Sequence, residues 1–551
     1  MEKPWYNQYP AETPHQIDMS SCASVVELFT QATSEYANLP AFENFGTQIT
    51  FQELNDLSAS FARYLQNTIG LKKGERVAVM MPNLLQYPIA IFGILRAGGV
   101  VVNTNPMYTP RELKHQLTDS GARAIVVLDK FANVVEQVID DVPCEHVLTT
   151  RVGDMLGLKG TLINFVLKYV RKDIPAYELP MAKPFKSTLQ ESSGQLETPD
   201  LNHDDLAFLQ YTGGTTGVAK GAMLTHGNLV ANMLQSGLWI NDVLEPGKEV
   251  VITALPLYHI FALTANCLVF MRIGACNYLI TDPRDMKNFV KELSTHRFTA
   301  ITGVNTLFNG LLNTEGFDQI DFSSLKVTLG GGMAVQRAVA ERWKQVTGVT
   351  LAEAYGLTET SPAVCINPPD LEEYNGSIGL PIPSTEVCVQ DGDGKQLPTG
   401  EVGELCVRGP QVMRGYWQRP EETAKVMTSD GWLKTGDMAK MDENGYFYIV
   451  DRKKDMILVS GFNVYPNEIE DVAVGHEGVL EAAAIGQPDE RCGEVVRLFI
   501  VKKDPNLTKE DVAAWCKENL TGYKRPKIIE FRDELPKTNV GKILRRELRD
   551  S

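Results

Sequence analysis

A run rich in glycine and threonine, YTGGTTGVAKGAMLTH from Tyr211 to His226, combines residue types that suit the phosphates of a nucleotide. Glycines let backbone N–H groups approach an anion, threonine hydroxyls donate hydrogen bonds, and a lysine adds a mobile positive charge. The spacing differs from G-x-x-x-x-G-K-[ST], so the run is not an ordinary P-loop. Its composition alone would also suit a flexible surface turn. The apolar run AFLQY before it and the helical run LTHGNLVANML after it instead predict strand, loop and helix, which favours a phosphate site. The candidate phosphate-binding residues are Thr212, Gly213, Gly214, Thr215, Thr216, Gly217 and Lys220.

Three later blocks complete a pattern with this loop. They are YGLTE at 355–359, DGWLKTGDMAKMDENGYFYIVDRKKDMI at 430–457 and KTNVGKILR at 537–545. In this order, the four blocks resemble the adenylate-forming superfamily of acyl-CoA synthetases, adenylation domains and luciferases. The block at 430–457 is similar to the signature region of fatty acyl-CoA synthetases. Stretches such as MMPNLLQYP, NPMYTPRELKHQL, ALPLYHIFALT and ILVSGFNVYPNEIEDV resemble bacterial long-chain fatty-acid CoA ligases, and the resemblance runs from Trp5 to Arg549.

The resemblance implies an enzyme that activates a fatty acid with ATP and Mg²⁺ to an acyl-adenylate and pyrophosphate, and then transfers the acyl group to coenzyme A. A medium-chain or aryl acid CoA ligase is the nearest alternative. A noncatalytic fatty-acid binding or transport protein with the same fold is the alternative from another class. The joint presence of Lys220, Glu359, Asp437 and Lys542 favours the enzyme.

The resemblance also assigns roles in the first half-reaction. Lys542 corresponds to the lysine that reaches the carboxylate and the α-phosphate, where charge develops that the enzyme must neutralise. By itself, a lysine in the basic stretch KILRREL would also suit a solvated tail. Glu359 matches the Mg²⁺ ligand, Thr358 the α-phosphate contact, and Tyr355 with Gly356 the residues beside the adenine.

Further positions carry over to the nucleotide and the acid. Asp437 matches the residue that accepts hydrogen bonds from the ribose hydroxyls, and Arg452 a second ribose or phosphate contact. Gly331, within GGG after the strand-like LKVTL, would let adenine or the acyl chain approach, although three glycines also suit a simple loop. His259 matches a position near the carboxylate pocket; a packed core histidine is its alternative. Lys434 departs from the histidine that fatty acyl-CoA synthetases commonly carry there, but Asp437 is intact.

The second half-reaction is thought to need a different orientation of the C-terminal domain. Asp451 matches the hinge position, and such a residue absorbs a backbone rotation without touching substrate. Gly461 in SGFNVYP resembles the segment that lines the pantetheine channel of coenzyme A in the thioester-forming orientation.

Alternating strand and helix patterns must position these residues. ERVAVMM, GGVVVN, RAIVVL, HVLTT, FTAITGV and LKVTLGGG are short β-branched runs, and FQELNDLSASFARYLQ has helical spacing. Such alternation predicts α/β layers with largely parallel sheets. After Pro381, D-G and N-G turns predict antiparallel hairpins. The expected architecture is a large N-terminal domain, 1–450, of layered α/β subdomains plus a small β-barrel-like subdomain, followed by a small mobile α+β domain, 451–551. In that domain we expect VVRLFIVKK as a strand and a helix capped by Thr508, after an exposed charged linker DRKKD.

Composition limits the partners. At 551 residues the chain exceeds one core, and a net charge of −16 argues against a nucleic-acid partner. The nine cysteines contain no C-x-x-C pair, which favours reduced thiols in the cytoplasm. The eight histidines contain no H-x-x-x-H pair, which argues against a dedicated zinc site.

The N-terminus lacks the pattern of a signal peptide, and the apolar stretch from Tyr258 to Met271 is shorter than a membrane span. Acyl chain length and oligomeric state stay open, with a homodimer as one alternative.

One segment, 158–172, suggests contact with the inner face of the cell membrane. Its sequence LKGTLINFVLKYVRK forms an apolar stripe with basic residues on the other side of the helix. The alternative is a helix packed on the domain with its basic face in water. The stripe consists of Leu158, Leu162, Phe165, Val166, Tyr169 and Val170, and the basic residues are Lys168, Arg171 and Lys172.

Overall fold

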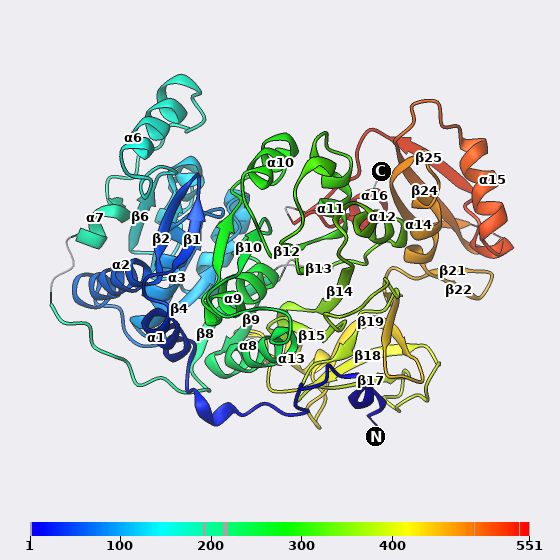
Figure 1. Cartoon of the computed structure of the whole chain (residues 1–551), viewed down its shortest axis with the longest axis horizontal. Coiled ribbons are helices and arrows are strands. Elements are labelled where there is room, and N and C mark those ends of the chain that lie inside the picture. Colours follow the sequence, from blue (N-terminus) through cyan, green and yellow to red (C-terminus); the bar gives the residue numbers. More distant parts are fainter. Residues whose placement is uncertain (1–2, 191–193, 213–218, 490, 539, 550–551) are drawn as a thin grey trace.

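The computed structural model describes residues 3–190, 194–212, 219–489, 491–538 and 540–549. The candidates Gly213, Gly214, Thr215, Thr216 and Gly217 lie outside the described residues. Figure 1 shows a large body formed by the first four-fifths of the chain and a smaller unit, orange to red, at one end of it. The described strands form four sheets.

A seven-stranded sheet occupies the part of the body that comes first in the sequence, in the order β7-β6-β5-β3-β4-β8-β9. Its strands are parallel except for β9, which pairs antiparallel with β8. The valine- and isoleucine-rich runs are buried on both faces, as parallel strands covered by helices require. The strands are β3 (Arg76–Met80), β4 (Val100–Asn103), β5 (Ala124–Leu128), β6 (His146–Thr150), β7 (Lys183–Pro184), β8 (Leu206–Thr212) and β9 (Lys220–Thr225).

The glycine-rich loop lies within a hairpin. Strand β8 ends at Thr212, and β9 begins at Lys220, which is paired with Thr212 in the register. The expected order of strand, loop and helix is therefore wrong, because an extra strand precedes the helix α8 (His226–Ile240). The threonine of LTH caps that helix, since the Thr225 hydroxyl accepts the N–H of Asn228 at 3.1 Å.

A nine-stranded sheet with the order β16-β15-β14-β13-β12-β10-β11-β1-β2 forms the centre of the molecule. The strands from β14 to β1 are parallel, and antiparallel strands complete both edges. The strands are β1 (Pro40–Asn44), β2 (Thr47–Thr50), β10 (Val250–Thr253), β11 (Cys276–Leu279), β12 (Ala300–Gly303), β13 (Val327–Gly331), β14 (Leu351–Gly356), β15 (Ala363–Ile366) and β16 (Leu380–Pro381).

Helices pack against both sheets and share one large hydrophobic core with them. The predicted helix FQELNDLSASFARYLQ is α2, which begins with a capping box between Thr50 and Glu53. The helices of the body are α1 (Val25–Glu35), α2 (Phe51–Tyr64), α3 (Gln86–Arg96), α4 (Pro110–Ser120), α5 (Ala132–Glu136), α6 (Gly157–Phe165), η6 (Val166–Val170), α7 (Phe185–Gln190), η7 (Ala262–Val269), α9 (Phe270–Arg272), α10 (Met286–Ser294), α11 (Asn305–Leu312), α12 (Arg337–Thr347), η9 (Thr358–Thr360) and α13 (Pro420–Val426).

The antiparallel hairpins expected after Pro381 form a four-stranded sheet in the order β17-β18-β19-β20. In this sheet Asp437 on β19 stands opposite Arg452 on β20. Because β20 is the last strand before the C-terminal unit, the register places two predicted nucleotide ligands next to the domain boundary. The strands are β17 (Glu386–Gln390), β18 (Gly403–Arg408), β19 (Leu433–Met441) and β20 (Phe447–Arg452).

The C-terminal unit has its own sheet and its own hydrophobic cluster. The predicted strand VVRLFIVKK lies in β24 and pairs with β23 over ten residue pairs. The predicted helix is α15, whose capping box joins Thr508 and Asp511. The elements are β21 (Ile457–Val459), β22 (Phe462–Val464), β23 (Val479–Asp489), β24 (Gly493–Lys502), β25 (Ile528–Arg532), α14 (Pro466–Val474), α15 (Lys509–Asn519) and α16 (Arg545–Arg549).

The junction DRKKD differs from the exposed linker that its charges suggested. Asp451 and Asp455 are buried, whereas the three basic residues between them are exposed. Arg545 lies 3.3 Å from Asp451 and 3.6 Å from Asp455, and Arg549 lies 2.8 Å from Asp455. The two acids are buried because arginines from the end of the chain neutralise them.

The apolar stretch from Tyr258 to Met271 is folded into the body, and much of it forms η7 beneath α8. Among the described residues, no helix has the length and apolar character needed to cross a bilayer.

Candidate active site

Two neighbouring parallel strands, β13 and β14, end at the same edge of the central sheet and bring glycines together there. A Cβ at Gly331 would lie 3.1 Å from the carbonyl oxygen of Ala354 and 3.1 Å from the ring of Phe261. A Cβ at Gly356 would lie 2.1 Å from the carbonyl oxygen of Pro362. Backbone packing therefore requires a glycine at 356, and a side chain at 331 would be tightly crowded. Ligands of open α/β sheets bind outside the carboxyl ends of the strands, so this edge is the candidate site.

A buried carboxylate, that of Asp437, meets the edge from the four-stranded sheet. The Tyr355 hydroxyl donates to Oδ2 of Asp437 at 2.6 Å, and Nε of Arg452 lies 3.6 Å from Oδ1. Burial raises the pKa of Asp437, and the charge of Arg452 and the hydrogen bond from Tyr355 oppose that rise. The structure thus brings together three residues predicted to bind adenosine, although they come from β14, β19 and β20.

The lysine of the last sequence block reaches the same place. A Cβ at Gly332 would lie 3.4 Å from Cε of Lys542, and the lysine lines the cavity described below together with His259 and Thr358. Burial and the neighbouring Arg452 lower the pKa of Lys542 to about 8. This environment differs from that of a solvated lysine in a basic tail. A titratable group whose pKa is shifted inside a cleft is typical of a functional site.

Glu359 and Lys220 are joined by a residue that the sequence motifs did not identify, Tyr416. Its hydroxyl donates to Oε1 of Glu359 at 2.7 Å, and Nζ of Lys220 lies 4.6 Å from the centre of its ring. Lys220 also lies 2.9 Å from Oε2 of Glu422 at the start of α13. Neither Tyr416 nor Glu422 lies in one of the sequence blocks. Their contacts with Lys220 join segments about 200 residues apart, and the contact of Tyr416 with Glu359 joins residues 57 apart.

The residues around Glu359 are compatible with magnesium held jointly with a nucleotide. The described residues contain no cluster of three His, Cys, Asp or Glu side chains that could hold a metal ion by themselves. Mg²⁺ is commonly bound by one or two carboxylates together with substrate phosphates and waters. One carboxylate, held by the Tyr416 hydroxyl beside Lys220, suits that arrangement.

His259 lines the cavity between the charged end and the apolar part. Its Nδ1 accepts the N–H of Phe261 at 3.3 Å, so the ring proton resides on Nε2. Burial and the charge of Lys542 lower the pKa of His259 to about 3, and the ring is therefore neutral at neutral pH. A neutral imidazole with Nε2–H can donate a hydrogen bond to a carboxylate oxygen and bring no second cation next to Lys542. His259 therefore lines the cavity with a neutral ring, and a role at the carboxylate stays a prediction.

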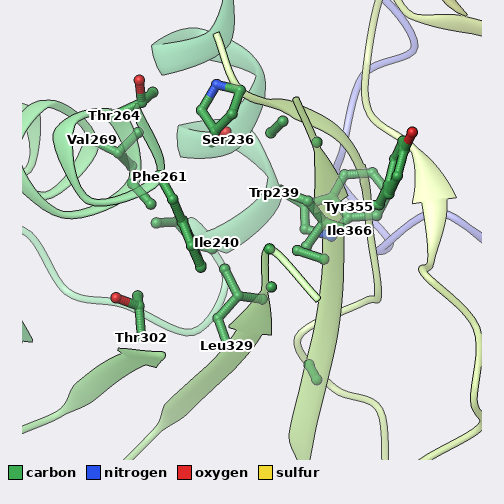
Figure 2. Close-up of a pocket in the computed structure, with 18 of the residues that line it drawn as sticks. Ser236, Trp239, Ile240, Phe261, Thr264, Val269, Thr302, Leu329, Tyr355 and Ile366 are labelled. Atoms are coloured by element: carbon green, nitrogen blue, oxygen red, sulfur yellow. The ribbon is translucent and has the colours of Figure 1, made fainter. Parts of the chain in front are cut away.

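An apolar cavity extends from this end along β13 and β14 and opens to solvent; its space of about 1230 Å³ includes that opening. The paired registers place Ala300, Val327, Thr302, Leu329 and Ala352 on one face of the sheet. Small side chains on this face leave the space that larger ones would fill. Figure 2 shows helical residues such as Phe261, Thr264 and Val269 across the cavity from Leu329 and Thr302, with Trp239, Tyr355 and Ile366 at one side.

Sequence reasoning identified Gly331 but missed the rest of this apolar wall. The signal is present as alternating small residues in FTAITGV and TLAEAYG, but it becomes readable only when three strands are aligned side by side. The missed lining residues are Ser236, Trp239, Ile240, Phe261, Ala300, Thr302, Leu329, Ala352 and Ala354.

Three contacts dock the C-terminal unit so that Lys542 enters the site. The Thr306 hydroxyl donates to the carbonyl oxygen of Gly541 at 3.0 Å, directly beside the lysine. The Asn309 side chain donates to the carbonyl oxygen of Leu480 at 3.0 Å. The backbone N–H of Arg337, at the start of α12, donates to Asp471 at 3.2 Å.

The predicted hinge residue is held by polar contacts on both sides. Asp451 accepts the backbone N–H groups of Arg452 at 2.7 Å and Asn467 at 2.9 Å. Arg545 adds its charge at 3.3 Å, and burial raises the pKa of Asp451 to about 6. Gly461, by contrast, lies in the exposed β21–β22 turn with φ +84° and does not line the cavity.

The fold and this site define an adenylate-forming ligase of two parts, and the comparisons agree. Residues 29–417 match the family AMP-binding enzyme, and residues 468–542 match the AMP-binding enzyme C-terminal domain. The chain belongs to the AMP-binding enzyme family.

Several relatives match over nearly the whole chain. A long-chain-fatty-acid–CoA ligase of Escherichia coli O6:H1 is 59% identical, over 100% of this chain and 98% of that protein. A long-chain-fatty-acid–CoA ligase of Haemophilus influenzae is 54% identical, with the same coverage of 100% and 98%. Among solved structures, an anthranilate CoA ligase in complex with anthranoyl-AMP superposes with a TM-score of 0.86 at 26% identity, and covers 97% of this chain and 98% of the other.

Proposed function

We propose that this protein is an ATP-dependent, AMP-forming ligase that joins long-chain fatty acids to coenzyme A. The observation that carries the proposal is one continuous cavity with a charged end at Lys542 and an apolar wall along β13. The relatives that match the entire chain act on the same substrates according to their names. ATP, coenzyme A and a fatty acid are its substrates, and Mg²⁺ is its metal.

The length of the cavity favours a long acyl chain. The five residues of β13 extend about 17 Å at about 3.3 Å per residue. An extended hydrocarbon chain gains about 1.3 Å per carbon, given a C–C bond of about 1.5 Å at a tetrahedral angle. The wall therefore accommodates about 13 carbons, and the two ends extend the total to about 14–16. A medium-chain or aryl acid would leave the distal half empty.

The reaction has two balanced steps. A carboxylate oxygen of the acid attacks the α-phosphorus of ATP, and pyrophosphate leaves. The thiol sulfur of coenzyme A then attacks the acyl carbonyl carbon, AMP leaves with the C–O bond electrons, and the thiol loses its proton. Lys542 neutralises charge between the carboxylate and the α-phosphate in the first step, Thr358 contacts that phosphate, and His259 orients the carboxylate from Nε2–H. A noncatalytic fatty-acid binding protein would have no need for these three residues beside an ATP phosphate.

The adenosine and phosphate assignments follow the same geometry. Asp437 receives the ribose hydroxyls, with Arg452 beside it, and Tyr355 with Gly356 borders the adenine. Thr212 and Lys220 begin and end the phosphate loop. Magnesium, when bound through Glu359 and the phosphates, supplies charge neutralisation for the departing pyrophosphate.

We also infer that 1–450 and 451–551 act as two domains that rotate about Asp451. Separate hydrophobic clusters on either side of Arg452 support two rigid bodies. The docked orientation, with Lys542 at the cavity, suits the first half-reaction. A rotated orientation would bring Gly461 to the site and open a path for the thiol of coenzyme A.

Separate assays of the two half-reactions test the ligase proposal. Lys542→Ala should lower ATP–pyrophosphate exchange about 10²- to 10³-fold, as expected for a lost electrostatic stabiliser. Thioester formation from synthetic acyl-adenylate should change far less, since the lysine acts in the first step. Equal losses in both assays would contradict the assignment, and wild-type protein that releases no AMP with any fatty acid would exclude the ligase.

A second proposal concerns the surface helix formed by α6 and η6, which stands out from the body at the upper left of Figure 1. Leu158, Leu162, Phe165, Tyr169 and Val170 are between 54% and 94% exposed. The helix contacts the body through its opposite side, where a Cβ at Gly160 would lie 1.8 Å from the carbonyl oxygen of Gly153. Five of the six stripe residues face outward and Val166 is half-buried, which favours an outward stripe over a packed one.

We infer that this outward stripe inserts into the surface of an anionic membrane at the cytoplasmic side, where fatty acids dissolve. The cations beside the stripe suit anionic lipid: Lys168 and Lys172 are exposed, and Arg171 is exposed but paired with Asp173 at 3.1 Å. Burying each apolar side chain contributes about 1.5–3 kcal/mol. The contact is peripheral.

Flotation with phosphatidylglycerol-containing vesicles tests this contact. Leu162→Ser with Phe165→Ser should lower binding at least about tenfold, and replacing the three basic residues with Gln should weaken it by about 1 kcal/mol per unpaired charge. High salt should reproduce the second effect only. Met181→Ser, which alters another exposed apolar residue, is the control. Unchanged flotation of both the serine variant and the Gln variant excludes membrane contact.

Sedimentation of the same samples without vesicles measures the mass of the particle and so tests the homodimer.

A further inference from the structure

The far end of the cavity lies at the amino ends of the parallel strands. Lys326 and Thr350, which immediately precede β13 and β14, line it, as does Ile240 at the end of α8. An acyl chain whose carboxylate is at Lys542 reaches these residues after about 17 Å of β13. The side chains at this end of the cavity therefore decide how long an acyl chain the cavity accepts.

Lys326 crosses this end of the sheet and is fixed at its tip. Its Nζ lies 2.8 Å from Oε1 of Glu249 and 3.4 Å from Oε1 of Glu245. Glu249 immediately precedes β10, and β12 lies between β10 and β13. The ion pair therefore spans two strand spacings, about 10 Å. Lys326 lines the cavity, and because its ammonium group is held by the carboxylates, we infer that its methylene stem faces the cavity.

Glu249 holds the ammonium group of Lys326 in place. Its side chain is fully buried, and its Oε2 has no hydrogen-bond partner among the described residues. Oε1 accepts the N–H of Glu245 at 2.6 Å in addition to the contact with Lys326. Moving the ammonium away would leave a buried, uncompensated carboxylate, which is strongly unfavourable. A substrate cannot displace Lys326 easily.

We propose that Lys326, held by Glu249 and Glu245, is the end stop of the acyl cavity and sets the longest acid that the enzyme uses efficiently. The terminal methyl group of an acid of about 14–16 carbons reaches the lysine stem with its whole chain buried. A longer chain must fold back or break the ion pair, and its added carbons gain no burial. This inference rests on the proposed function, because only an acyl substrate enters this cavity.

The test compares acyl-CoA formation from octanoate, palmitate and eicosanoate. Lys326→Ala combined with Glu249→Gln removes the stop and the charge that it would leave behind. We expect the ratio of kcat/KM for eicosanoate to that for octanoate to rise at least about tenfold, since one methylene in an apolar pocket is worth about tenfold or more. Lys248→Ala is the matched control, because Lys248 pairs with Glu245 at 2.6 Å outside the cavity lining.

A second variant acts in the opposite direction and is independent of the ion pair. Val327→Phe adds bulk at the same end of the cavity and should lower the ratio of palmitate to octanoate at least about tenfold. If wild-type protein is active on palmitate but the ratios of kcat/KM are unchanged in both variants, the end stop is excluded and the proposed function stands. If wild-type protein ligates none of the three acids, the proposed function fails and the end stop with it.

Discussion

At the scale of residues, the candidate site balances charges that are individually unfavourable. Lys542 is buried beside Arg452, and Asp437 and Glu359 supply the opposite charge. The shifts are opposed: burial lowers the pKa of the lysine and raises that of Asp437. Such an arrangement suits a site that must receive a polyphosphate, because the protein keeps a cation available close to neutral pH.

We expect kcat/KM for ATP–pyrophosphate exchange to fall above about pH 8, where a lysine with a pKa of about 8 loses its ammonium charge. The fall should approach tenfold per pH unit, since kcat/KM reports the free enzyme. Lys542→Arg keeps its charge in this range, so its profile should stay flat there even though its rate is lower. If kcat/KM falls over the same pH range in the wild-type protein and in Lys542→Arg, the titrating group is not Lys542.

Tyr416 should act through Glu359 as a positioning residue. Tyr416→Phe removes the hydroxyl that donates to Oε1 at 2.7 Å. We expect the Mg²⁺ concentration for half-maximal exchange to rise about 10- to 100-fold, as is typical when a supporting hydrogen bond to a metal ligand is lost. Tyr448→Phe is the control, because it removes a similar hydrogen bond of 3.1 Å from Tyr448 in β20 to Asp442 in the preceding turn. An equal response of the two variants to Mg²⁺ would contradict the assignment.

At the scale of elements, two features decide function: the aligned face of β12, β13 and β14, and the end of β20. The first forms the apolar wall. The second ends in Asp451 and Arg452, so one short strand carries both the proposed hinge and a proposed ribose contact. The proposed rotation at Asp451 would move the entire C-terminal unit, and Arg545, which pairs with this aspartate, belongs to α16 in that unit.

Asp451→Pro should separate the half-reactions. Proline fixes φ near −65° and limits rotation, so we expect exchange to persist while overall acyl-CoA synthesis collapses. The variant also removes the carboxylate that pairs with Arg545 at 3.3 Å. Asp451→Ala removes only the carboxylate and should retain more of the overall rate. If the two variants lose the overall rate equally, the carboxylate rather than the backbone rotation is responsible.

At the scale of the whole molecule, the docking of the two parts assembles the site. Thr306, Asn309 and Arg337 contact the C-terminal unit, and these contacts surround the entry of Lys542. These three hydrogen bonds are polar contacts, which suits an interface that opens in the proposed cycle.

A reversible cross-link between the two parts tests this cycle. Asn309→Cys with Leu480→Cys places one thiol on each part, at two residues that are in contact because the Asn309 side chain donates to the Leu480 carbonyl oxygen at 3.0 Å. After treatment with a short, cleavable bis-maleimide, we expect exchange to persist and acyl-CoA synthesis to stop, with recovery on cleavage. The single variants are controls, since eight of the nine native cysteines are buried. Full acyl-CoA synthesis in the cross-linked protein would show that no rotation is needed.

Much of the local structure and the identity of the charged site residues could be predicted from the sequence. The β-branched runs became β3, β4, β5, β6, β12 and β13, because such side chains suit a buried pleated surface. Thr50, Thr225 and Thr508 cap the helices that follow them, since capping depends on residues three apart. Lys542, Asp437 and Glu359 were found because their short blocks resemble a family.

The tertiary structure alone decided the apolar wall, the burial of Asp451, the outward direction of the stripe on α6 and the ion pair at Lys326. Three of these depend on segments that are distant in the sequence: the register of three strands, an arginine 94 residues from Asp451, and a lysine that reaches across β12. The direction of the stripe depends on how the helix packs through Gly160 on the preceding loop at Gly153. Periodicity reports which side of an element is apolar. It does not report which neighbour covers that side, because the neighbour is chosen by packing of the complete chain.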